Sequence, residues 1–176
     1  MTDASPEFSR LVRVETIGEV PRHLRIEADA DERRRLAGRF RLVGIGSLVA
    51  EADLSRIAGG LLAEGRITAD VVQSCVATGE PVPARIDAPF RLRFVADMPE
   101  AEELELSEED FDTIPFDGAA LDLGEAAAET MALELDPFPR APDADAVLRA
   151  AGVRHEDEVT GGAFDALKAL KDRMDR

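Results

Sequence analysis

The sequence predicts an α+β fold: a long antiparallel sheet, curved or forming a partial barrel, with helices from the C-terminal half packed against it. Apolar and polar residues alternate over long stretches between residues 47 and 96, as in strands that bury one face. Beyond them the chain becomes acidic, and its apolar residues recur at helical spacing. We therefore expect one domain over residues 1–176, with a neutral β-rich half (1–96), an acidic connection (97–110) and a helical acidic half (111–176).

Two short strands and a helix are expected before the alternating region. Residues 8–14 and 23–28 alternate in the way that strands do. Asp29 offers a side-chain acceptor at a helix start, and Glu32 follows three residues later, as in a capping box. This helix is expected to end at about Arg39.

The alternating region divides into three strands that follow one another as a meander. Their expected bounds are residues 47–57, 61–76 and 83–96. Gly59 and Gly60 supply a flexible turn between the first two strands. Between the last two, Gly79 can adopt a positive φ angle and Pro81 fixes its own φ angle, which favours a turn. Strands of this length twist, so the sheet is expected to curve.

Helices are expected after the acidic connection. Asp122 is a suitable N-cap and Glu125 follows it by three residues. The apolar side of this helix is formed by Ala126, Thr130, Met131 and Leu133. The prolines between residues 136 and 142 end it. A short helix over 143–150 and a last helix over 162–171 complete the chain.

The charge of the chain is unevenly distributed. The net charge is -16, yet residues 1–96 carry 14 arginines and 14 acidic residues, whereas residues 97–176 carry 7 basic and 23 acidic residues. Such an acidic half repels phosphate and disfavours nucleic-acid binding by the whole surface. One cysteine, no signal-peptide pattern and no long apolar run indicate a cytoplasmic protein with no membrane contact.

One dense basic cluster lies in and just after the first helix. It consists of Arg33, Arg34, Arg35, Arg39 and Arg41. Arginine is suited to bidentate contact with phosphate or carboxylate, so this cluster is the candidate surface for RNA or for a partner protein. The alternative interpretation is a solvated helix face, since five arginines on a short segment need not share one side of the helix.

The sequence predicts neither an enzyme nor a metal or cofactor site. A structural zinc site needs four nitrogen or sulfur ligands, and the chain offers only Cys75, His23 and His155, which are widely separated. Neither histidine lies in a nucleophile–base motif. Cys75 continues the apolar side of its strand and is expected to be a small buried side chain.

Four segments resemble the YceD family, the "large ribosomal RNA subunit accumulation" proteins. They are Cys75-Val-Ala-Thr-Gly-Glu-Pro-Val82, Asp117-Gly118 with Leu121-Asp-Leu-Gly-Glu125, Leu135-Asp-Pro-Phe-Pro-Arg140, and Phe164-Asp-Ala-Leu-Lys-Ala-Leu-Lys171. Their order and spacing match the family, and the resemblance extends from about residue 42 to residue 171. Many members have Cys-x-x-Cys at the first segment, where this chain has Thr78 in the second cysteine position.

The resemblance implies a non-catalytic factor for the synthesis, processing or accumulation of large-subunit ribosomal RNA. The implied partners are that RNA or its precursor, bound directly or through basic ribosomal or processing proteins, and no DNA is expected. The family-motif positions, for which structural roles are expected, are Cys75, Gly79, Asp117, Gly118, Asp122, Glu125, Pro139 and Arg140. The alternative is a small metal- or ligand-binding β protein that shares the scaffold.

Overall fold

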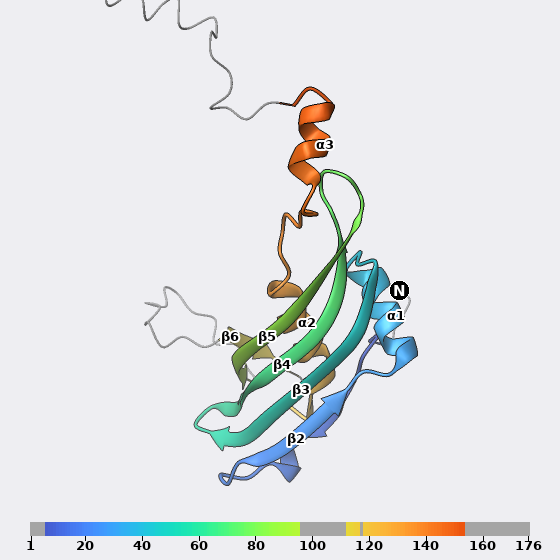
Figure 1. The fold of residues 1–176 in the computed structure, drawn as a ribbon. Coiled ribbons are helices and arrows are strands. Elements are labelled where there is room, and N and C mark those ends of the chain that lie inside the picture. The colour runs from blue at the N-terminus through green and yellow to red at the C-terminus, as the bar shows by residue number, and fades with distance from the viewer. Residues whose placement is uncertain (1–5, 96–111, 117, 154–176) are drawn as a thin grey trace, which may run out of the picture.

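The computed structural model describes residues 6–95, 112–116 and 118–153 (Figure 1). Three predictions therefore lie outside the described residues: the acidic connection 97–110, Asp117 and the last helix 162–171. The described strands are β1 (Leu11–Arg13), β2 (Arg22–Glu27), β3 (Gly44–Ile57), β4 (Gly60–Ser74), β5 (Pro81–Val95), β6 (Asp112–Pro115) and β7 (Ala120–Asp122). The helices are η1 (Val14–Thr16, a 3-10 turn), α1 (Ala30–Arg39), α2 (Leu123–Leu133) and α3 (Ala144–Ala150).

The main sheet has five strands in the order β2-β3-β4-β5-β6, and β1 pairs separately with β7. The predicted meander is confirmed, because β3, β4 and β5 follow one another as antiparallel neighbours. Their 14 or 15 residues make them long strands, and Figure 1 shows that they bend along their length. The sheet stays open, since β2 and β6 lie at opposite edges of it.

Strand β6 was not expected from the sequence. It pairs in parallel with the end of β5, so that Leu92 lies opposite Asp112 and Val95 opposite Pro115. Ile114 and Phe116 pack against the core from here. Four residues are too few for a periodicity to show, and a parallel neighbour requires a connection that returns along the sheet.

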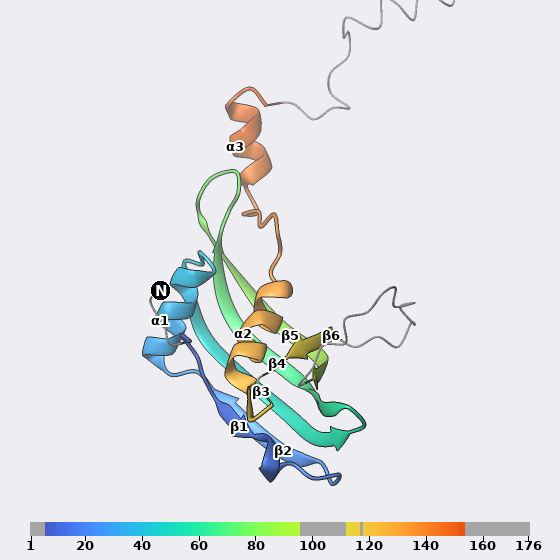
Figure 2. The ribbon, with the colours of Figure 1, turned by 180° about the vertical axis from the view of Figure 1, so that it is seen from behind.

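One face of the sheet carries the core. Figure 2 shows that α1 and α2 cover the same face, so a helix from the N-terminal half joins those predicted from the C-terminal half. The side chains between them are buried, among them Leu48, Leu54, Ile67, Phe90, Phe94, Leu36 and Met131. The opposite face is lined with exposed charged residues in cross-strand pairs such as Arg91 and Glu64, whose side chains approach to 2.9 Å. We call strands β2–β5 with α1 and α2 the sheet body.

A second, much smaller cluster lies where the β4–β5 hairpin ends. It contains Cys75, Ala141 and Ala144, with Ala77 and Val82 packed against it. The chain leaves α2, runs past this end of the hairpin and continues into α3 beyond the tip of the hairpin (Figure 1). Residues 73–82 together with residues 133–144, which include Leu133 as the last residue of α2, are called the hairpin end.

Candidate functional site

The turn at the hairpin end is held by its own backbone. The N–H of Cys75 donates to the carbonyl of Glu80 at 2.8 Å, and the N–H of Gly79 donates to the carbonyl of Cys75 at 2.9 Å. Gly79 has a φ angle of 76°, in the left-handed region that favours glycine. The turn predicted from Gly79 and Pro81 is therefore present, with the glycine in the conformation expected for it.

Three contacts join this turn to the segment that follows α2. The side-chain amide of Gln73 donates to the carbonyl of Asp136 at 2.8 Å. The N–H of Val76 donates to the carbonyl of Pro139 at 2.9 Å, and the N–H of Ala141 donates to Sγ of Cys75 at 3.3 Å. Two of the segments that resemble the YceD family, about 60 residues apart in the sequence, thus lie side by side.

The Cys75 thiol lies in this contact and is 3 % exposed. Hydrogen bonds from the Thr78 side chain and from the N–H of Ala141 lower the pKa of Cys75 to about 7, against the opposing effect of burial. In the part of the chain that the structure describes, no group of three or more His, Cys, Asp or Glu residues is placed to hold a metal ion. What the geometry shows for Cys75 is a packed side chain that accepts a hydrogen bond.

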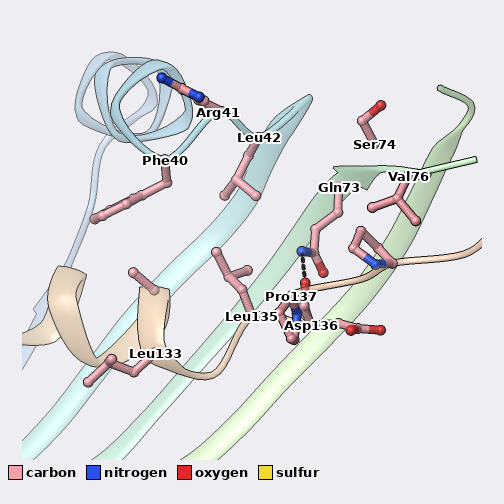
Figure 3. Close-up of a pocket in the computed structure, with 12 residues that line it drawn as sticks. Phe40, Arg41, Leu42, Gln73, Ser74, Val76, Leu133, Leu135, Asp136 and Pro137 are labelled. Atoms are coloured by element: carbon pink, nitrogen blue, oxygen red, sulfur yellow. Dashed lines mark hydrogen bonds between the residues drawn. The ribbon is translucent and has the colours of Figure 1, made fainter.

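A groove of about 500 Å³ opens beside this contact. Three segments form it: the residues that follow α1, the end of β4, and the C-terminal end of α2 with the chain beyond it. Figure 3 shows Phe40 and Leu42 on one side and Leu133 and Leu135 on the other, with the Gln73–Asp136 hydrogen bond at the end of the groove. Arg41 also lines it, with a φ angle of 55°.

Large apolar side chains are exposed along the groove. Leu133 is 78 % exposed and Val76 is 55 % exposed, and both line it. Phe138 is 72 % exposed and lies between two prolines that line it, Pro137 and Pro139. Its own N–H donates to Oδ1 of Asp136 at 2.8 Å, which fixes the backbone that presents the ring. Leu133 was predicted on the apolar side of its helix, and that prediction is wrong for this residue, which is the last of α2 and lies exposed at the groove instead of in the core.

The groove lies at an electronegative end of α2. The last turn of α2 contains no basic residue, so the partial negative charge of its C-terminal carbonyls has no compensating cation on that turn. The exposed carboxylates of Glu134 and Asp136 follow directly. Residues 118–153 as a whole carry seven acidic and two basic side chains, and one of those two, Arg140, contacts the carboxylate of Asp145 at 2.9 Å.

Asp122 and Glu125 take part in a different contact, near the start of α2. The Asp122 carboxylate caps the helix by accepting from the N–H groups of Gly124 and Glu125, as predicted. It also accepts from the hydroxyl of Ser9 at 2.6 Å and from the N–H of Arg10 at 2.8 Å. Asp122 therefore joins the N-terminal segment to α2, while Gly118 adopts a φ angle of 85° in the preceding turn.

Four arginines of the predicted cluster are hydrogen-bonded to groups of the same chain. Glu125 accepts two hydrogen bonds from Arg39, at 2.9 and 2.6 Å, and these contacts join α1 to α2. The hydrogen bond with Glu125 raises the pKa of Arg39, and Glu7 adds to this effect. Arg35 donates to the carbonyl of Glu7, Arg33 to the carbonyl of Ala28 and Arg34 to the carboxylate of Asp31. RNA contact by this cluster stays a prediction.

Comparison with known families identifies the chain. The family model described as "Large ribosomal RNA subunit accumulation protein YceD" matches residues 63–171, more than half of the sequence. The chain belongs to the YceD family. The matched region contains most of β4, all of β5 and α2, and most of the groove, while the side formed by Phe40, Arg41 and Leu42 lies before it. Searches of curated proteins and of solved structures gave no match.

Sequence reasoning missed most of the residues that make the groove. Phe138 offered one signal, because a phenylalanine between two prolines cannot continue a helix and has no periodic partner to share a core position. Leu133 offered none, since its spacing of three residues from Thr130 and seven from Ala126 fits an apolar helix side. No helix in the described part of the chain has the length and apolarity that a membrane span requires.

Proposed function

We propose that this chain is a non-catalytic factor in the accumulation of large-subunit ribosomal RNA, and that it acts in the cytoplasm by binding. The observation that carries the proposal is the family match over residues 63–171. The family is described by the accumulation of this RNA and not by a reaction, which favours a factor that binds over one that catalyses.

The roles of the charged groups support binding over catalysis. A catalytic carboxylate or thiol needs a neighbouring group that matches its pKa to a proton transfer. The carboxylates of Asp29, Glu32 and Asp122 instead accept hydrogen bonds from helix N-termini or from neighbouring segments. These three carboxylates therefore have structural roles: they hold helix starts and neighbouring segments in place.

The described surface favours protein contact over extended RNA contact. Nucleic-acid binding draws most of its affinity from basic side chains that replace counterions on phosphates. Here Arg35, Arg39 and Arg140 are already hydrogen-bonded to groups of the same chain. The groove beside α2, by contrast, combines exposed apolar side chains with acidic neighbours. We propose that the factor reaches the RNA through a protein partner.

The decisive experiment is the ratio of mature large-subunit to small-subunit ribosomal RNA in a strain that lacks this gene. We expect a selective loss of the large-subunit RNA, at normal or at low growth temperature, and its recovery when the intact gene is supplied. The small-subunit RNA is the internal control, because a general growth defect lowers both. An unchanged ratio at both temperatures would contradict the proposed function.

A further inference from the structure

The groove at the hairpin end has the features of a docking surface for another protein. Such a surface adds a specific partner to the proposed function of the chain. We propose that it receives a basic segment of a large-subunit ribosomal protein, whose apolar side chains contact Leu133 and Phe138 and whose lysines or arginines face Glu134 and Asp136. The inference rests on the proposed function, because it names the kind of partner through which the factor would reach the RNA.

Two large apolar side chains in and beside the groove are exposed. Leu133 and Phe138 are 78 % and 72 % exposed, and Leu133 lines a groove of about 500 Å³ whose other side carries Phe40 and Leu42. Single exposed apolar residues are ordinary, whereas several of them around one concave surface are typical of an interaction site. Burying a leucine and a phenylalanine side chain is worth about 1.5–3 kcal/mol each, so an occupant that covers both gains substantial affinity.

Charge decides which occupant fits. The C-terminal end of α2 has no basic residue in its last turn, and the exposed carboxylates of Glu134 and Asp136 follow it. This end attracts cations and repels phosphate. Arg41 is the basic side chain that lines the groove, at the side formed by the residues after α1. A protein segment that combines lysine or arginine with apolar side chains complements this arrangement, and RNA does not.

The surface is also fixed before binding. Hydrogen bonds from Gln73 to Asp136 and from Val76 to Pro139 hold the segment that carries Phe138 against β4. A third, within the segment, joins the N–H of Phe138 to the Asp136 carboxylate. The flanking prolines restrict the backbone further. A pre-ordered surface loses little conformational freedom on binding, which favours an interaction site over an incidental exposed ring.

The experiment titrates the full chain with each protein of the large ribosomal subunit, purified free of RNA, at low salt. We expect at least one of them to bind, and its affinity to fall about tenfold or more in the variants Leu133→Ser and Glu134→Lys. Neither variant should unfold the chain: Leu133 is exposed, and a lysine at the C-terminal end of α2 is favourable for the helix. Added salt should also weaken the binding, since the charge contacts are exposed.

Matched controls lie at the opposite end of the sheet. Val20 is 82 % exposed and Glu19 is exposed beside it, in the loop before β2. Val20→Ser and Glu19→Lys repeat the two chemical changes away from the groove, and we expect the affinity to stay unchanged in both. A loss of the same size in the controls would mean that overall charge or solubility decides the binding, and would overturn the proposal.

Three results separate this inference from the proposed function. If no large-subunit protein binds at low salt, or if the affinity is the same in both groove variants as in the natural chain, the proposed docking surface is wrong. If a labelled large-subunit RNA fragment binds instead and Leu133→Ser weakens it, the occupant is RNA and the inference is overturned. When the gene deletion lowers the large-subunit RNA and the groove variants restore it fully, the proposed function stands without this surface.

Discussion

The sheet body and the hairpin end are stabilised by different means. The sheet body buries large side chains on one face of the sheet, such as Phe94, Leu48 and Met131, each at most 2 % exposed. The hairpin end has only a small apolar cluster, made of Cys75, Ala141 and Ala144, and hydrogen bonds from Gln73, Val76 and Ala141 join its two segments. It leaves Val76 and Phe138 exposed.

This difference separates stability from binding within one chain. Burial of large apolar groups dominates folding free energy, so changes in the sheet body should act on the fold. The hairpin end contributes less to that free energy and places its apolar groups outside, so changes there should act on partners.

The strongest test compares two positions on α2 that lie two residues apart. Met131 is fully buried and Leu133 is 78 % exposed. We expect Met131→Ala to lower the free energy of unfolding by about 2–5 kcal/mol, since it leaves a cavity in the core. Leu133→Ala should change it by no more than about 0.5 kcal/mol. Urea denaturation of both variants measures the difference, and equal losses would contradict the division.

An intermediate effect is expected at the contact that joins the N-terminal segment to α1. Glu32 is 10 % exposed at its side chain and accepts two hydrogen bonds from Arg10, at 2.7 and 2.8 Å. It also completes the capping box by accepting from the N–H of Asp29. We expect Glu32→Gln to lower the free energy of unfolding at neutral pH by about 1–2 kcal/mol. The exposed Glu15→Gln is the control, with an expected change below about 0.5 kcal/mol.

The pH dependence of this variant follows from the pKa of Glu32. The hydrogen bond from Arg10 holds that pKa below its ordinary value, although burial opposes the shift. A lowered pKa contributes stability above the unfolded pKa, and this contribution disappears as the pH falls through the folded pKa. The stability gap between the natural chain and Glu32→Gln should therefore narrow in acid. A gap that widens below pH 4.5, the ordinary pKa of Glu32, would contradict the assignment.

The smallest and most specific effect concerns Cys75. Its pKa is lowered from 9.0 to about 7, with the Thr78 side chain as the main cause. The thiolate is thus favoured in the folded chain, and the resulting stability is present above pH 9 and is lost as the pH falls through about 7. Relative to Cys75→Ala, the natural chain should gain stability between about pH 7 and pH 9. Thermal unfolding of both across this range measures the gap, and a constant gap would refute the shift.

The long strands and the helix starts could be predicted from the sequence because their causes are local. Alternation of apolar and polar residues determines which strand face is buried, and this gave β3, β4 and β5 with their turns. Asp29 and Asp122 cap their helices because an acceptor one residue before a helix finds free N–H groups whatever lies around it. The α+β class followed from these elements.

Contacts between distant segments were decided only by the tertiary structure. No local pattern shows that β6 pairs with β5 in parallel, that residues 136–141 lie against the Cys75 turn, or that Arg39 contacts Glu125. These outcomes depend on which surfaces meet when the core closes. The exposure of Leu133 has the same origin: its spacing of seven residues from the buried Ala126 fits one side of the helix, yet Leu133 is left 78 % exposed beside the groove. The groove arises there, from packing that the sequence alone does not specify.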